Sequence, residues 1–387
     1  MIVARVIQGI GGGVLPLAFG IIRDEFPREK VSGAVGTIAA LAAAGAGLGI
    51  VLAGPIVDAL DYHWLFWFPM IILVLAGIAA QIVVPASPVR SHGTISIKGA
   101  FLLSAWLVAL LLAISEGRSW GWTSGRVLGL LAVAVVLAVV WIVVESRSAS
   151  PLIDMKMMRL PAVWTTNLVA LLFGVAMYAT FAFLPSFLQT PSSAGYGFGA
   201  SVTRSGLILL PSSIAMFALG LASGRLSARF GSKAVLVTGA MISVVTFALL
   251  TFAHSSTWEI LLAMVIQGVG FGLAFAAMSN LIVAAVPPEQ TGVASGMNAN
   301  IRTIGGSIGA AVMSSIVTSG LRPDGLPREA GYTHGFAMIT GAAVLAALAT
   351  LLVPAVRRGP ASTDPDKTPH AELALVAGGT LVGDEPE

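Results

Sequence analysis

Long apolar segments separated by short polar connections dominate the hydropathy pattern of this chain. The segments are continuous rather than alternating, which is typical of membrane-spanning helices and not of the strands of a β-barrel. At about 1.5 Å of rise per residue, each is long enough to cross about 30 Å of hydrocarbon. The pattern predicts eleven spans, at residues 3–22, 32–56, 64–84, 98–115, 126–144, 162–189, 203–223, 234–253, 258–285, 292–318 and 334–356.

The composition agrees with a membrane protein. Hydrophobic residues make up 56% of the 387 positions and charged residues only 10%, against about 25% in soluble domains. The net charge of +3, without a basic patch that contains aromatic residues, argues against a nucleic-acid partner. Cysteine is absent, and no metal-binding His/Glu pair, phosphate-binding loop or serine-hydrolase motif is found. We therefore expect a protein embedded in the lipid bilayer that is not an enzyme and holds no cofactor or metal.

A short motif occurs twice in the chain, about 260 residues apart. Val6-Ile7-Gln8-Gly9 returns as Val265-Ile266-Gln267-Gly268, and Gly45-x-x-x-Gly49 returns as Gly305-x-x-x-Gly309. Repetition of one helix–loop–helix unit predicts two pseudo-symmetric halves.

The distribution of basic residues predicts the orientation of the spans. Fourteen of the 21 Lys and Arg residues lie on the side of the 23–31 loop and four lie on the other side. Because cytoplasmic loops are enriched in Lys and Arg, the 23–31 loop and the C-terminus are predicted to be cytoplasmic, with Met1 on the outer side.

Charged and amide side chains inside the spans are the first candidates for function, because an unpaired charge in hydrocarbon is costly. Arg5 and Gln8 lie one turn apart in the first span, and Asn298 and Arg302 lie in the tenth. We expect all four to line a central cavity. Two alternatives remain: Arg5 reaches the outer surface by snorkelling, and Arg302 is part of a structural pairing.

The remaining polar side chains within the spans are weaker candidates for function. Asn167 and Asn280 are expected to form ordinary interhelical hydrogen bonds. We expect no carboxylate deep within any span, although a proton-coupled carrier needs a titratable group in the membrane.

Aromatic and methionine residues are concentrated in the sixth span: Met177, Tyr178, Phe181, Phe183 and Phe187. A surface of this kind binds varied lipophilic or cationic molecules, because methionine repacks easily and aromatic rings attract cations. The alternative is that these side chains are ordinary membrane core.

Four glycines, Gly36, Gly45, Gly49 and Gly54, lie in the second span and precede Pro55. Gly45 and Gly49 share one face of the helix and are expected to let a neighbouring backbone approach closely. The contact is either simple packing or the moving surface of a conformational change.

These motifs resemble the major facilitator superfamily and, within it, the fourteen-span drug:proton antiporters of the EmrB/QacA type. Arg5-x-x-Gln8-Gly9 resembles the family's fourth-helix motif R-x-x-Q-G, and the glycines from Gly36 to Gly54 resemble its fifth-helix antiporter motif. Its cytoplasmic loop motif, G-x-L-a-D-r-x-G-r-k, is similar to residues 224–233, with Ala228 in place of the acid. The matching positions of this loop are Gly224, Arg229, Gly231 and Lys233.

The resemblance implies an all-α polytopic transporter in the cytoplasmic (inner) membrane of a prokaryote. It implies export of lipophilic or cationic small molecules in exchange for protons by alternating access. It also implies that three helices before residue 1 are missing. The expected parts are then the remainder of the N-terminal half at 1–90, a central extra pair of spans at 91–150, the C-terminal half at 151–356 and a disordered cytoplasmic tail at 357–387. Two other interpretations remain: an inactive or regulatory membrane fragment, and an uncoupled pore or lipid-handling protein.

Overall fold

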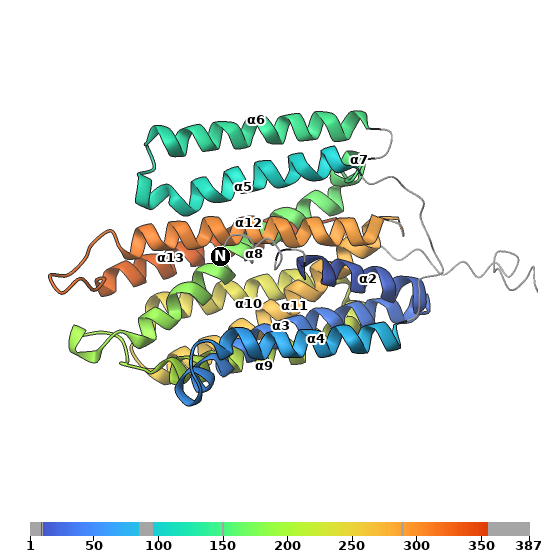
Figure 1. The fold of residues 1–387 in the computed structure, drawn as a ribbon. Coiled ribbons are helices and arrows are strands. Elements are labelled where there is room, and N and C mark those ends of the chain that lie inside the picture. The colour runs from blue at the N-terminus through green and yellow to red at the C-terminus, as the bar shows by residue number, and fades with distance from the viewer. Residues whose placement is uncertain (1–8, 10, 85–95, 149–150, 288–289, 355–387) are drawn as a thin grey trace, which may run out of the picture.

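The computed structural model describes residues 9, 11–84, 96–148, 151–287 and 290–354, and these residues are almost entirely helical (Figure 1). A long helix occupies the position of ten of the eleven predicted spans, and the all-α polytopic fold is confirmed. Of the first predicted span, 3–22, the structure describes only residue 9 and residues 11–22, and the helix there begins at Val14 and ends at Glu25. The helical elements are η1 (Gly11–Gly13), α2 (Val14–Glu25), α3 (Arg28–Ala59), α4 (Trp64–Val83), α5 (Ile97–Trp120), α6 (Gly125–Arg147), α7 (Met155–Met158), α8 (Pro161–Gln189), η2 (Ser192–Ala194), α9 (Val202–Phe230), α10 (Ser232–Phe252), α11 (Thr257–Ala285), α12 (Thr291–Val317) and α13 (Glu329–Leu352).

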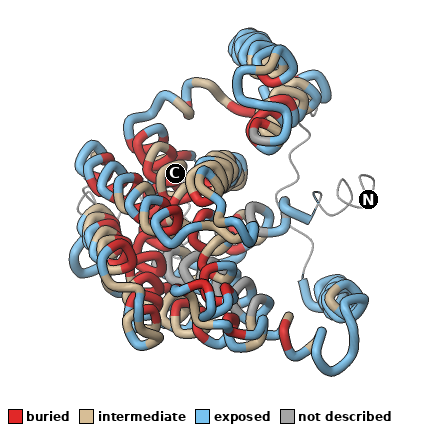
Figure 2. Tube along the Cα trace, turned by 90° about the vertical axis from the view of Figure 1, so that its left-hand side faces the viewer, coloured by how far each residue is buried: buried red, intermediate tan, exposed pale blue. Residues whose placement is uncertain are grey.

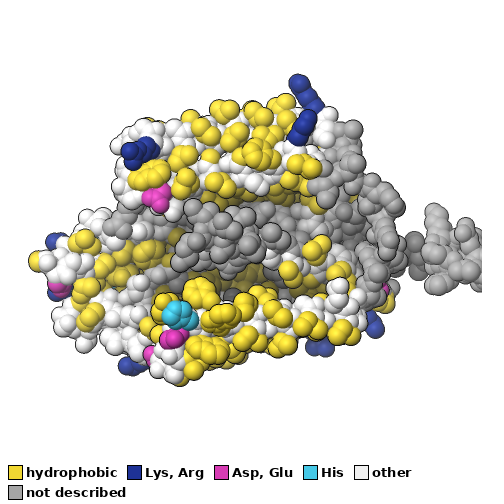
Figure 3. Space-filling view, in the orientation of Figure 1, with side chains coloured by type: hydrophobic (Ala, Val, Ile, Leu, Met, Phe, Trp, Pro, Cys, Tyr) yellow, Lys and Arg dark blue, Asp and Glu magenta, His cyan; other side chains and the backbone are white. Residues whose placement is uncertain are grey.

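Eight helices in the described part of the chain are long and apolar enough to cross a membrane: α4, α5, α6, α8, α9, α10, α11 and α13. Helix α12 has 27 residues and is long enough, but it contains Arg302 and many Asn, Ser, Thr and Gly residues. On the face shown in Figure 3, charged side chains gather towards the ends of the helices and hydrophobic side chains lie between them. This is the surface expected of a polytopic membrane protein.

Helices α8–α13 form the well-packed part of the molecule, where most buried residues lie (Figure 2). Helix α8 lies along α12 and α13, α10 lies along α11 and α13, and α9 lies along α11. Large side chains such as Phe173, Phe247 and Phe271 are fully buried between them. Glycines bring the backbones together: a Cβ atom on Gly239 of α10 would lie 2.7 Å from the carbonyl oxygen of Gly270 on α11.

Helix α3 connects the N-terminal segment to this core by packing along α9. Gly54 is buried there, and a Cβ atom on it would lie 2.5 Å from the Cα atom of Thr203. The Thr203 hydroxyl donates a hydrogen bond of 2.8 Å to the Asp58 carboxylate. The neighbouring elements are less enclosed: α4 has no buried residue, and the α5–α6 hairpin projects from the bundle, with α5 against α12 (Figures 1 and 2).

The close approach expected at Gly45 and Gly49 is not observed among the described residues. Both glycines are exposed, and no described atom lies within 4 Å of a Cβ atom built on either one. Helix α3 instead contacts α9 through Gly54, one of the four glycines of the motif. The physical reason is that α3 has small residues around its whole circumference, so the sequence does not define which face meets a partner. The surroundings of Gly36 lie outside the described residues.

Candidate functional site

Helices α8 and α12 approach so closely that glycines on each side contact the backbone of the other. A Cβ atom on Gly305 would lie 2.8 Å from the carbonyl carbon of Leu171, and one on Gly309 would lie 2.6 Å from the Cα atom of Val175. Gly174 of α8 lies against the carbonyl oxygen of Arg302. The backbone contact predicted for the first glycine pair is therefore found at the second pair, Gly305 and Gly309.

This interface places Arg302 near the middle of α12, facing α11 and α8. Its guanidinium carbon lies 5.0 Å from the ring centroid of Phe275 on α11, which is a cation–π distance. The ring of Tyr178 on α8 packs against Gly306, which lies about one turn after Arg302. Within the described part of the chain, Arg302 has no ion pair and its side chain forms no hydrogen bond. Of the structural pairings that were the alternative for Arg302, the described residues provide the contact with Phe275 and no ion pair.

Asn298 lies about one turn before Arg302 and joins the same two helices. Its Nδ2 atom donates a hydrogen bond of 2.9 Å to Oδ1 of Asn167, and both side chains are buried. The interhelical hydrogen bond expected for Asn167 is thus confirmed. The Nδ2 atoms of Asn167 and Asn280, and the Ser295 hydroxyl, are buried without a partner among the described residues. Buried groups of this kind are costly unless water or a ligand satisfies them.

The aromatic residues of α8 do not form the single surface that the sequence suggested. Tyr178 is 39% exposed and lies beside Arg302. Phe181 packs against the hydrophobic core of α8–α13, and Phe187 is fully buried. Successive helical residues are about 100° apart, so residues grouped in the sequence point to several sides. Tyr178 alone of these three shares the surface with Arg302.

Phe187 belongs instead to an aromatic cluster at the end of the bundle where α8 and α10 stop. Its ring contacts those of Tyr196, Tyr332 and Phe336 at centroid distances of 6.0, 5.2 and 5.8 Å. The Tyr196 hydroxyl donates to the Pro327 carbonyl oxygen, and burial raises the pKa of Tyr196 above its usual range. The cluster ties the α8–α9 connection to the α12–α13 connection and keeps the packing of these four helices fixed.

The predicted cytoplasmic loop motif forms the tight connection between α9 and α10. Gly231 adopts φ +86°, a conformation that favours glycine, and lets α10 begin immediately after α9 ends. Lys233 donates a hydrogen bond of 2.9 Å from Nζ to the Leu351 carbonyl oxygen at the end of α13. A cation at this position also interacts favourably with the helix dipole. Arg229 stacks on the Phe230 ring at 5.3 Å, and Gly224 lies within α9 one helical turn before Ala228.

A buried carboxylate, Glu145, was not identified from the sequence. It lies at the end of α6, is 2% exposed, and its Oε2 atom accepts a hydrogen bond of 3.1 Å from the Ile153 backbone. Its Oε1 atom lies against Gly99 in the first turn of α5 and has no hydrogen-bond partner among the described residues. The only feature of the sequence that could have drawn attention to Glu145 is its position at the end of an apolar span. The sequence does not show that the start of α5 and the segment before α7 cover it.

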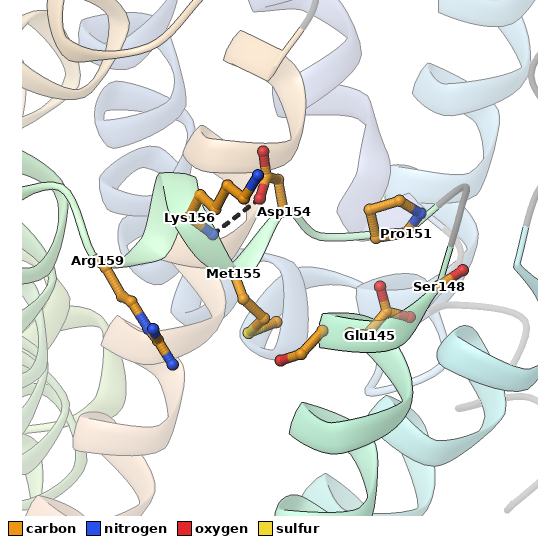
Figure 4. A pocket seen from close by; sticks show the side chains of 8 residues that line it. Glu145, Ser148, Pro151, Asp154, Met155, Lys156 and Arg159 are labelled. Carbon is orange, nitrogen blue, oxygen red and sulfur yellow. Dashed lines mark hydrogen bonds between the residues drawn. The ribbon is translucent and has the colours of Figure 1, made fainter.

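A cavity of about 390 Å³ opens beside Glu145 (Figure 4). Asp154 caps α7 by accepting a 2.8 Å hydrogen bond from the Lys156 backbone, and Gln290 lies 3.4 Å from its other oxygen. Figure 4 shows the Lys156 side chain on the side of Asp154 and the Arg159 side chain extending away from it. Two acidic and two basic residues balance in the lining, which consists of Glu145, Ser146, Ser148, Pro151, Asp154, Met155, Lys156 and Arg159.

Arg5 and Gln8, the other two residues expected at a central cavity, lie outside the described residues. The repeat partner of Gln8, Gln267 on α11, is fully buried, and neither polar atom of its amide has a partner among the described residues. Next to it, Gly268 lies against the Ser212 carbonyl oxygen of α9. The second copy of the motif is thus at a close contact between two core helices.

The sequence of this chain is similar to those of bacterial transport proteins. Over 326 residues, the chain is 29% identical to the multidrug transporter protein MdtP of Bacillus subtilis, covering 82% of this chain and 59% of MdtP. It is 27% identical over 323 residues to the tetracenomycin C resistance and export protein of Streptomyces glaucescens, with the same two coverages. The chain therefore spans somewhat less than two thirds of the length of these relatives.

A solved structure supports the fold. The human organic anion transporter MFSD10 (TETRAN) superposes with a TM-score of 0.62 at 17% sequence identity, over 90% of this chain and 70% of that protein. The family model of the Major Facilitator Superfamily matches this chain twice, over residues 1–195 and 190–383. Because these two matches cover nearly the whole chain, the protein belongs to the Major Facilitator Superfamily.

Proposed function

We propose that this chain acts in proton-coupled export of lipophilic small molecules across the cytoplasmic membrane of a prokaryotic cell. One observation carries the proposal: a member of this superfamily holds Arg302, a cation with no ion pair among the described residues, close to Tyr178 and Phe275 in the middle of its packed helices. The names of the bacterial relatives, which describe multidrug transport and antibiotic resistance and export, support the export of drug-like molecules. The fourteen-span branch remains part of the proposal.

In the proposed mechanism, the N-terminal part, with α2, α3 and α4, rocks against α8–α13, and the central site opens to one side of the membrane at a time. The α3–α9 contact at Gly54 and Thr203 joins the two parts. The exposed glycine surface of α3 at Gly45 and Gly49 suits a sliding contact, because it offers no side chains to interlock. The Lys233 hydrogen bond to the Leu351 carbonyl oxygen joins α10 to α13.

The proposed proton carrier is a carboxylate and not Arg302, since arginine stays protonated at any usable pH. Arg5 and Gln8 are proposed to line the same pathway. A permanent positive charge about 4–6 Å from a carboxylate lowers the carboxylate pKa, which favours proton release at the site.

Uptake of a fluorescent lipophilic dye by proteoliposomes tests the proposal. With an imposed proton gradient across the membrane, we expect dye movement that exceeds that of empty vesicles and stops when an uncoupler is added. Dye movement that continues unchanged after the uncoupler is added would favour the uncoupled pore. A well-folded protein that moves no dye in either condition would favour an inactive or regulatory fragment.

The proposed orientation can be checked in intact cells because the chain contains no cysteine. Residues 23–31, 145–161 and 224–233 are proposed to be cytoplasmic, and residues 190–202 and 319–333 to lie outside. A Ser193→Cys variant should react with an impermeant thiol reagent, whereas Ser232→Cys should react only after the cells are permeabilised. The opposite labelling pattern would reverse the orientation and remove the basis for export.

A further inference from the structure

We propose that Arg302 recognises an acidic group on the transported molecule. The substrates would then be amphipathic organic anions, with a carboxylate, sulfonate or phenolate on an apolar aromatic body. This inference rests on the proposed export function and specifies the substrate class of the same site.

The charge of Arg302 is not compensated by the described protein. Arginine does not lose its proton, and no described Asp or Glu forms an ion pair with it. A permanently charged group among apolar helices is costly without a counter-ion. The contact with the Phe275 ring recovers only part of this cost, because a cation–π interaction is weaker than full hydration.

The free hydrogen-bond donors of Arg302 determine which partner fits. Phe275 lies at 5.0 Å from the guanidinium carbon, whereas the N–H groups of the guanidinium have no acceptor among the described residues. These donors form a planar fork that matches the two oxygens of a carboxylate or sulfonate. Tyr178, which is 39% exposed beside the guanidinium, supplies an aromatic surface for the body of such a molecule.

The neighbouring polar groups of α12 do not compete for this role. The Thr303 hydroxyl donates to the Ala299 carbonyl oxygen at 3.1 Å, and the Ser307 hydroxyl donates to the Thr303 carbonyl oxygen at 3.2 Å. Both hydroxyls thus satisfy their own helix and bring no negative charge. An incoming acid would be the missing acceptor.

The same geometry argues against cationic substrates, which the aromatic residues of α8 had suggested. An aromatic ring attracts cations through its face, but the Phe275 ring already interacts with Arg302 of the protein itself. A cationic ligand would also meet the like charge of Arg302 in a medium that screens charge poorly. A neutral ligand would leave the guanidinium without a counter-ion.

An acceptor for Arg302 has two possible sources: the acid of a substrate, or a carboxylate of the protein outside the described residues. A set of three pyrene probes can separate them, since pyrenebutyrate, pyrenebutanol and pyrenebutyl-trimethylammonium share one aromatic body and differ in charge. Binding to the purified 387-residue chain in detergent is measured by fluorescence anisotropy, and no transport is required.

We expect pyrenebutyrate to bind at least about tenfold more tightly than pyrenebutanol, and the cationic probe to bind most weakly. Arg302→Gln should remove these differences, and Arg302→Lys should keep part of the preference, because the charge remains while the planar fork is lost. Arg204→Gln is the matched control, since Arg204 is exposed at the start of α9. It should leave all three affinities unchanged.

Three results would overturn the inference. One is equal binding of the acid and the alcohol, and another is tighter binding of the cation. The third is a large fall in the melting temperature of Arg302→Gln with an unchanged order of affinities, which would identify a carboxylate of the protein as the acceptor. The export proposal is judged separately by dye movement in proteoliposomes: export without the anion preference would refute only the inference, and the preference without export would refute only the proposed function.

Discussion

Gly305→Leu is expected to prevent α8 and α12 from packing and to leave little folded protein. A Cβ atom on Gly305 would lie 2.8 Å from the carbonyl carbon of Leu171 and 3.0 Å from its Cα atom. Overpacking typically costs about 1–3 kcal/mol, when side chains can move aside. Here the obstacle is backbone, which has no alternative rotamer, so we expect the upper end of that range or more. Yield and monodispersity after size-exclusion chromatography, and the melting temperature of any protein recovered, measure the effect.

Gly45→Leu provides the matched control, because Gly45 occupies the equivalent place in the first copy of the repeat. It is exposed, and no described atom would lie within 4 Å of a Cβ atom at this position, so leucine there meets open space. Leucine also has a better helix propensity than glycine by somewhat less than about 1 kcal/mol. We expect normal yield and an unchanged or slightly higher melting temperature. Equal damage from both substitutions, or a Gly305→Leu protein as stable as the wild type, would contradict the assigned contact face.

The positions of the helices were predictable, because apolar runs and their polar interruptions are local properties. The run that predicted a span at 64–84 became α4, and the one at 126–144 became α6, each within a few residues. The start of α10 was marked by Gly231, whose positive φ of +86° permits the abrupt turn after α9. Hydrophobicity sufficed here since lipid, like a protein core, selects continuous apolar helices.

The contacts between helices were less predictable. Gly45 and Gly305 have the same spacing to a second glycine, yet only Gly305 meets a neighbouring backbone in the described structure. Small residues allow a close approach but do not require one, so the outcome depends on which helix lies opposite. The same limit applies to Tyr178 and Phe187, which lie in one apolar segment but point to different surroundings.

The surroundings of charged side chains were the least predictable from the sequence. For Arg302, the sequence left both a cavity and a structural pairing open, because the choice depends on the positions of neighbouring helices. Glu145 was overlooked because its burial depends on Gly99, which is 46 positions earlier in the sequence. Burial of a charge is a tertiary property, whereas hydropathy measures only the segment that contains it.

Glu145→Ala is the second substitution with a large expected effect. The wild-type carboxylate accepts the Ile153 backbone hydrogen bond at 3.1 Å and occupies the space in front of Gly99. Its removal leaves a buried N–H group without an acceptor, which costs about 1–3 kcal/mol. It also separates α5, α6 and the segment before α7, which the carboxylate connects. We therefore expect a clear fall in the melting temperature in detergent, while Arg147→Ala, at an exposed position two residues later, should have no effect.

Gly99→Ala makes this prediction specific, because the added methyl group would occupy the place of the Glu145 Oε1 atom. As a single substitution in the wild type, it should lower the melting temperature by displacing the carboxylate. In the double variant Gly99→Ala/Glu145→Ala, the methyl group instead fills part of the space that the carboxylate vacated. The double variant should then be no less stable than Glu145→Ala alone, so the two effects are strongly non-additive. Simple addition of the two losses would show that Gly99 and Glu145 act independently and that the carboxylate does not connect α5 to α6.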